Sequence, residues 1–105
     1  MTASSIIYAN SLFSLADGEE RLESVLEALE FVKSVLEDNP EYPAVLDAPM
    51  IKLEERLSLI DSAFCTVDEY VVNFLKLLCE KKNVHTFADC FKQFVKLYNK
   101  KNNIE

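Results

Sequence analysis

The side chains of this 105-residue chain that could carry out chemistry are three cysteines, Cys65, Cys79 and Cys90, and a single histidine, His85. The cysteines lie far apart and form no Cys-x-x-Cys pair, whereas zinc sites and disulfide frameworks usually need closer, paired cysteines. Cys79 and Cys90 lie among apolar residues, where a reduced cysteine behaves as a small hydrophobic side chain. We therefore expect no metal, no disulfide and a reducing, cytoplasmic compartment. An enzyme that uses Cys79 or Cys90, with His85 as its base, is an alternative.

Other kinds of catalytic or cofactor site lack the residues that they need. Gly18 is the only glycine, which excludes the glycine-rich loops that bind nucleotide phosphates. The acidic residues mostly recur at spacings of three and four, the pattern of solvated helix faces rather than of a carboxylate pair in a cleft. We therefore expect no catalytic residues and no cofactor, and interpret His85 as a residue at a helix boundary.

Charge is distributed unevenly along the chain. The net charge is −7, yet the last third is basic. The lysines that follow residue 70 are Lys76, Lys81, Lys82, Lys92, Lys96, Lys100 and Lys101. Nucleic-acid binders usually have a basic excess over the whole domain and arginines for base edges, whereas Arg21 and Arg56 both lie in acidic segments here. We interpret the lysines as solvated helix faces and a basic tail, and expect no nucleic-acid partner.

The elements that position these side chains are helices. Apolar residues recur at helical spacing along nearly the whole chain, and no alternating run is long enough to predict a strand. Helices are predicted at about 4–16, 19–38, 41–46, 53–64, 66–81 and 86–100. The connections between them are short, which favours antiparallel neighbours. The sequence therefore predicts an all-α fold, a compact six-helix bundle that residues 1–105 form as one domain.

Capping residues supply the expected ends of these helices. Gly18 is expected to close the first helix in the left-handed conformation. Asp17 and Glu20 are expected to form a capping box at the start of the second helix, and Thr66 and Glu69 another at the start of the fifth.

Two of the predicted helices are more apolar than an outer helix of a small bundle requires. Such a helix needs an apolar stripe of about 100°. The apolar arc covers roughly 220° of the fifth helix and roughly half of the first. Central burial could explain either helix alone, but two such helices in a small domain favour an exposed groove between them. A groove of this kind binds an amphipathic partner helix.

The order of several short motifs resembles a known family. Residues 8–16 read Tyr-Ala-Asn-Ser-Leu-Phe-Ser-Leu-Ala, and this segment resembles the opening Tyr-Ala-x-x-Leu-Phe-x-Leu-Ala signature of the delta subunit of bacterial F-type ATP synthases. That subunit is the counterpart of the mitochondrial oligomycin-sensitivity-conferring protein. Further matching segments follow in the family's order and extend the resemblance over essentially the whole chain: Val25-Leu26 with Leu29, Asn39-Pro40-Glu41, Asp47-Ala48-Pro49, Leu53-Glu54-Glu55-Arg56, Asn73 to Leu78 with Glu80, and Phe87 to Tyr98.

Two positions depart from the family pattern. Asn83-Val84 stands where the family usually has arginine and leucine, so the apolar position is kept and the basic one is lost. Arg56 stands where the family commonly has lysine, which keeps the positive charge.

The resemblance implies a non-catalytic role in proton-driven ATP synthesis. In this family the six-helix N-terminal domain lies on the catalytic head and binds N-terminal helices of alpha subunits, chiefly between its first and fifth helices. A second, C-terminal domain binds the stalk b subunits. We expect that domain to be absent from this chain and the isolated domain to be monomeric. The resemblance also implies a peripheral location on the cytoplasmic face of the bacterial cell membrane, without membrane insertion.

Helical periodicity then separates the predicted groove from the core. The core positions on the two helices are expected to be Ala9, Phe13, Val71, Leu75 and Leu78. The partner-binding groove is expected to be lined by Tyr8, Ser11, Leu12, Leu15, Tyr70, Asn73, Phe74 and Leu77. The face of the fifth helix that carries Val72 and Cys79 is an alternative groove. A free-standing helical adaptor, which binds an unrelated amphipathic peptide in the same groove, is the alternative function.

Overall fold

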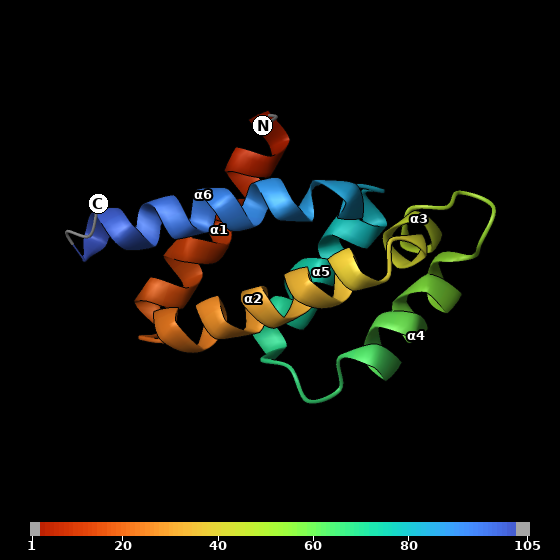
Figure 1. Cartoon of the computed structure of the whole chain (residues 1–105), viewed down its shortest axis with the longest axis horizontal. Coiled ribbons are helices and arrows are strands. Elements are labelled where there is room, and N and C mark those ends of the chain that lie inside the picture. The colour runs from red at the N-terminus through yellow and green to blue at the C-terminus, as the bar shows by residue number, and fades with distance from the viewer. Residues whose placement is uncertain (1–2, 103–105) are drawn as a thin grey trace.

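The computed structural model describes residues 3–102, so residues 1–2 and 103–105 of the predicted domain lie outside the described range. Within it the chain forms six α-helices, one short 3-10 helix and no strand (Figure 1). These are α1 (Ala3–Gly18), α2 (Leu22–Asp38), α3 (Glu41–Leu46), α4 (Leu53–Ala63), α5 (Glu69–Glu80), η1 (Val84–Thr86) and α6 (Phe87–Lys101). The predicted all-α, six-helix fold is confirmed. None of the helices in residues 3–102 combines the length and the hydropathy needed to cross a bilayer.

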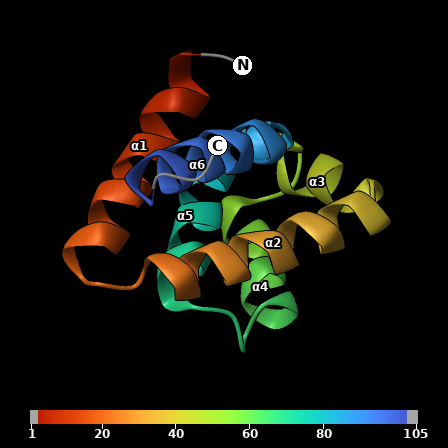
Figure 2. The same cartoon turned by 60° about the vertical axis from the view of Figure 1, so that its left-hand side comes forward.

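The first and last helices pack against each other. α6 crosses α1 obliquely and also contacts α2, while α4 packs on α5 (Figures 1 and 2). The rings of Phe13 and Phe94 meet edge to face, with their centroids 5.4 Å apart, and Gln93 Nε2 donates to Asn10 Oδ1 at 3.1 Å. The buried residues of α2 recur at spacings of three and four, as on one face of a helix: Val25, Leu29, Val32 and Leu36. Leu22 and Leu26 are half-buried and pack against this core. These contacts place the core between α1, α2, α5 and α6.

The turn between α1 and α2 differs from the prediction. Gly18 belongs to α1 and has no positive φ, whereas Glu20 adopts the left-handed conformation with φ 57°. The N–H of Arg21 donates to the Ala16 carbonyl at 2.8 Å, and that of Glu20 donates to the Asp17 carbonyl at 3.1 Å. These two bonds define a Schellman turn, which satisfies the last carbonyls of α1. Glu20 is needed for that turn, so the capping box predicted for Asp17 and Glu20 is wrong, and α2 begins only at Leu22.

The start of α5 also differs from the prediction. The N-cap is Asp68, whose Oδ1 accepts a hydrogen bond from the N–H of Tyr70 at 2.9 Å. The N–H of Val67 donates to the Phe64 carbonyl at 3.0 Å, so the chain still turns away from α4 at this point. The capping box predicted for Thr66 is therefore wrong, because α5 starts only after this turn.

Arg56 is a buried cation. Its side chain, on α4, is 5% exposed. Nε donates to the Ile51 carbonyl at 3.0 Å, and Nη1 donates to the carbonyls of Leu46 and Cys79, both at 3.1 Å. One guanidinium thus joins the end of α3, the loop before α4 and the last turn of α5.

We expect Gly18→Ala to stabilise the protein. Gly18 is helical and a Cβ there would meet no atom within 4 Å, so the better helix propensity of alanine should contribute about 0.5–1 kcal/mol. Glu20→Gly should also be stabilising, because glycine adopts a positive φ without steric cost. Urea denaturation measures both changes. Glu20→Ala is the control, since alanine keeps the Cβ, and a destabilised Gly18→Ala variant would contradict the described turn.

Candidate functional site

An apolar groove lies between α1 and α5. Its volume is about 500 Å³. The residues that line it are Ile7, Tyr8, Ser11, Leu12, Leu15, Tyr70, Asn73, Phe74 and Leu77. The structure thus brings all eight predicted residues together around one cavity and adds Ile7. No lining residue carries a charge at neutral pH.

The floor and the rim of the groove differ in exposure. Leu12 and Phe74 form the floor and are only 5% and 6% exposed. Ile7, Leu15 and Leu77 form the rim, at 61%, 47% and 38% exposed. The floor residues also belong to the core, so the sequence-based division into core and groove faces is too sharp for them. Three large aliphatic side chains nevertheless remain open to solvent along one cavity.

The groove exists because its two helices have different neighbours. α1 packs against α6 and α5 packs against α4, whereas α1 and α5 touch each other only sparsely. The predicted core face of α5 is confirmed, because Val71, Leu75 and Leu78 are fully buried. The side of α5 turned toward α1 therefore keeps apolar residues that the chain itself does not fully cover.

The alternative groove face of α5 is excluded by its burial. Cys79 is fully buried, and its thiol donates to the Leu46 carbonyl at 3.3 Å. Val72 is half-buried and packs against the core. Of these two residues only Val72 is partly open to solvent, so this face offers less apolar surface than the groove between α1 and α5.

The two buried thiols lie in surroundings that oppose ionisation. Burial raises the pKa of Cys79, and burial raises the pKa of Cys90 to about 11. Both thiols are thus held in the protonated form at neutral pH, whereas a nucleophilic cysteine acts as the thiolate. His85, in η1, instead pairs through Nδ1 with Asp47 Oδ2 at 2.8 Å. Residues 3–102 contain no cluster of three or more histidine, cysteine or acidic side chains that could hold a metal.

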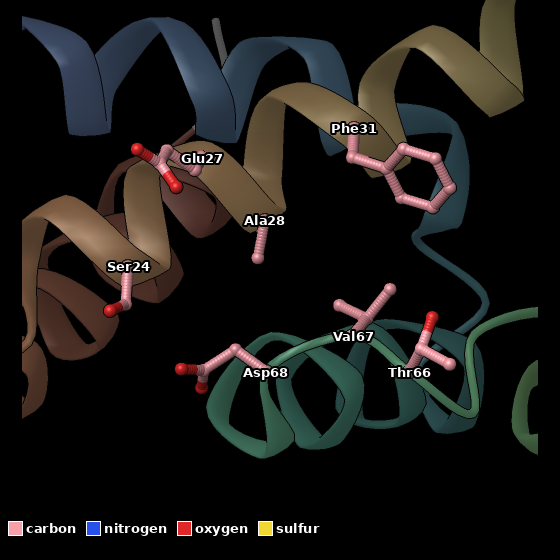
Figure 3. Close-up of a pocket in the computed structure, with 7 residues that line it drawn as sticks. All are labelled: Ser24, Glu27, Ala28, Phe31, Thr66, Val67 and Asp68. Carbon is pink, nitrogen blue, oxygen red and sulfur yellow. The ribbon is translucent and has the colours of Figure 1, made fainter.

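A second hollow lies between α2 and the segment that leads into α5 (Figure 3). It is lined by Ser24, Glu27, Ala28, Phe31, Thr66, Val67 and Asp68. Its apolar surface is smaller than that of the groove, and the Asp68 carboxylate is already engaged, as the N-cap of α5 and in an ion pair with Arg21. The groove between α1 and α5 is therefore the stronger candidate for a binding site.

Comparison with known proteins agrees with the family suggested by the sequence motifs. Residues 5–105 match a family model described as ATP synthase delta (OSCP) subunit. The chain is 33% identical over 98 residues to the chloroplastic ATP synthase subunit delta of Galdieria sulphuraria, an alignment that covers 92% of this chain and 55% of that protein. It is 30% identical over 93 residues to the ATP synthase subunit delta of Staphylococcus aureus strain JH9, covering 88% of this chain and 52% of that protein. The chain thus spans about half the length of the curated relatives that it matches.

Proposed function

This chain belongs to the ATP synthase delta (OSCP) subunit family, and we propose that it is a non-catalytic domain of the peripheral stalk that takes part in proton-driven ATP synthesis. The groove between α1 and α5 binds an N-terminal helix of an alpha subunit. The domain thereby fixes the catalytic head to the stalk, whose b subunits are contacted by other parts of the full-length subunit. The complex holds the domain at the cytoplasmic face of the membrane.

The observation that carries this proposal is the shape and chemistry of the groove. Amphipathic helices bind in apolar grooves through residues spaced at i, i+3, i+4 and i+7. Ile7 and Leu15 lie eight residues apart on α1, which is about 12 Å along a helix axis. The groove therefore accommodates about two turns of a partner helix, with the partner's apolar side chains on Leu12 and Phe74 and its flanks against the exposed rim.

Two polar residues suit the groove to a helix backbone. Ser11 is small and exposed, so a partner helix can approach α1 closely at that point. Asn73 is exposed on the facing helix, and its amide can pair with a polar group of the partner. Together they provide register without placing a charge in the contact.

The proposed role is mechanical, because the stalk must prevent the head from turning with the rotor. A contact under torque has to dissociate slowly, and slow dissociation depends on well-packed apolar anchors rather than on exposed ion pairs. The α1 wall of the groove is braced from behind by α6 through the Phe13–Phe94 contact and the hydrogen bond of Gln93 to Asn10. These contacts make the clamp stiff.

We expect a peptide with the sequence of an alpha-subunit N-terminal helix to bind this domain with an affinity that changes little with salt. Raising the salt from about 0.01 to 1 M shortens the Debye length from about 30 to 3 Å, which weakens exposed ion pairs but not apolar contacts. Calorimetric titration should also give a negative heat-capacity change.

A scrambled peptide of the same composition is the control for this titration. Steep weakening with salt would instead point to the acidic face of α2 as the binding site. Failure of the native peptide to bind at any salt concentration would overturn the proposed function.

A further inference from the structure

Arg21 connects the two helices of the groove at one end. Its Nη2 donates to Asp68 Oδ2 at 2.7 Å, and its guanidinium carbon lies 4.6 Å from the centroid of the Tyr70 ring. Tyr70 lines the groove. We propose that Arg21 is a positioning residue for the groove, which holds the end of α1 and the first turn of α5 at the separation that a partner helix requires. This inference rests on the proposed function.

Hydrogen bonds to α1 and to α2 hold the backbone of Arg21 in place, so the position of its side chain depends on the position of the end of α1. The N–H of Arg21 donates to the Ala16 carbonyl in the last turn of α1 at 2.8 Å. The carbonyl of Arg21 accepts from the N–H of Val25 in the first turn of α2 at 2.9 Å. The guanidinium therefore starts from a rigid turn rather than from a flexible loop.

Asp68 carries the link into α5. Its side chain is only 8% exposed, and each of its two oxygens accepts a different hydrogen bond. Oδ2 accepts from Arg21, while Oδ1 accepts from the N–H of Tyr70. The ion pair with Arg21 thus orients the Asp68 carboxylate, which caps α5 by accepting the hydrogen bond from Tyr70, a residue of the groove.

The Tyr70 ring is held by the same guanidinium. A planar guanidinium stacks on an aromatic face, whereas a lysine ammonium does so less well. Among the ion pairs of residues 3–102, only those of Arg21, with Asp68 and with Glu69, join the α1–α2 turn to α5. Since α1 and α5 otherwise touch sparsely, loss of Arg21 should make the Tyr70 ring more mobile and the distance between the two helices less fixed.

The variants Arg21→Gln and Asp68→Asn test this link. Asparagine caps helices as well as aspartate does, so Asp68→Asn removes the charge and keeps the cap. Because the Arg21 side chain is 38% exposed, loss of the ion pair itself should cost little stability, and both variants should fold. Arg21→Gln leaves the 8% exposed Asp68 carboxylate with the N–H of Tyr70 but without its cation, so it should lower the melting temperature more than Asp68→Asn does. Each should weaken binding of the alpha-subunit peptide about five-fold, the factor that corresponds to about 1 kcal/mol. The double variant should bind no more weakly than either single variant, because both remove the same interaction.

Two further variants separate positioning from general effects. Arg21→Lys keeps a charge pair but loses the planar stack, so it should rescue binding only in part. Lys101→Gln is the matched control, because it breaks the ion pair with Asp17, which joins α6 to α1 and does not involve α5. It should leave peptide affinity unchanged. Wild-type affinity in Arg21→Gln would overturn the positioning role while leaving the proposed function intact.

Hydrogen exchange of the free protein provides a readout that needs no partner. Amides in the first turn of α5 should exchange faster in Arg21→Gln than in the wild type, and Lys101→Gln should not change them. If the wild type fails to bind the peptide, the proposed function fails, and this exchange measurement alone decides whether Arg21 positions α5. Equal exchange in the wild type and in Arg21→Gln would overturn the inference.

Discussion

Leu75→Glu is expected to destabilise the protein by several kcal/mol, whereas Leu77→Glu is expected to leave its melting temperature nearly unchanged. The two leucines lie two residues apart on α5 and so point about 200° from each other. Leu75 is fully buried and Leu77 is 38% exposed. A glutamate at position 75 would place an unpaired carboxylate in the core. Burial would raise the pKa of that carboxyl, so the variant should be more stable at acidic pH, where the group is protonated, than at neutral pH.

Leu77→Glu should instead affect binding. It removes an apolar rim residue and adds a charge that must lose water when the partner helix binds. The expected cost is about 2 kcal/mol or more if Leu77 is a hot spot, or roughly a thirty-fold rise in Kd. Leu59→Glu is the matched control, because Leu59 on α4 is 40% exposed and lies outside the groove. Thermal unfolding and peptide titration of the three variants measure these effects. Unfolding of Leu77→Glu but not of Leu75→Glu would contradict the assignment of the core and groove faces of α5. Normal peptide binding by Leu77→Glu would show that α5 is not part of the binding site.

Arg56→Met is expected to cost about 2 kcal/mol or more of unfolding free energy. The substitution removes the guanidinium donor from the carbonyls of Ile51, Leu46 and Cys79. The Leu46 carbonyl keeps only the weak thiol donor of Cys79, and the Cys79 carbonyl keeps the N–H of Lys82. An unsatisfied buried polar group costs about 1–3 kcal/mol. Relief from the desolvation of the guanidinium offsets part of this cost. The carbonyls cannot be removed with the side chain, so the net effect should be destabilising.

Arg56→Lys should be less harmful than Arg56→Met, because an ammonium group still donates hydrogen bonds, although not in the planar geometry of the guanidinium. Urea denaturation at neutral pH measures both variants. Lys52→Met is the control, since Lys52 is an exposed cation next to α4, and its loss removes only charge. If Arg56→Met were as stable as the wild type, the hydrogen bonds of the guanidinium would make no net contribution to stability, which would contradict this prediction.

The helical periodicity of the sequence predicted both the fold and the groove. The apolar stripe of α2 and the bounds of α3 follow from local signals, namely the i, i+3, i+4 spacing and the Asn39-Pro40 break. The groove was predictable for a different reason. α5 has apolar residues over more of its circumference than its neighbours in the fold can cover, and such an excess is visible without knowing any contact.

The buried cation and the helix caps could not be predicted as easily. Arg56 lies in an acidic segment, and charge alone indicates a solvated face. Its spacing on α4, three residues after Leu53 and four before Ile60, places it on the apolar side, and this was the available signal. The caps depend on where the chain turns in three dimensions. α1 continues for two residues beyond Ala16, its last apolar residue. The turn that ends the helix therefore places Glu20 rather than Gly18 in the left-handed conformation.

The packing of α6 against α1 has a consequence for the order of events during synthesis. Asn10 and its hydrogen-bond partner Gln93 are 83 residues apart, and the ring of Phe13 rests on that of Phe94. α1 therefore leaves the ribosome well before α6, the helix that supports it. Contacts this distant in sequence form late in folding, so a nascent chain that still lacks α6 carries one wall of the groove without its brace. We expect a complete groove to meet an alpha-subunit helix only after α6 has emerged from the ribosome.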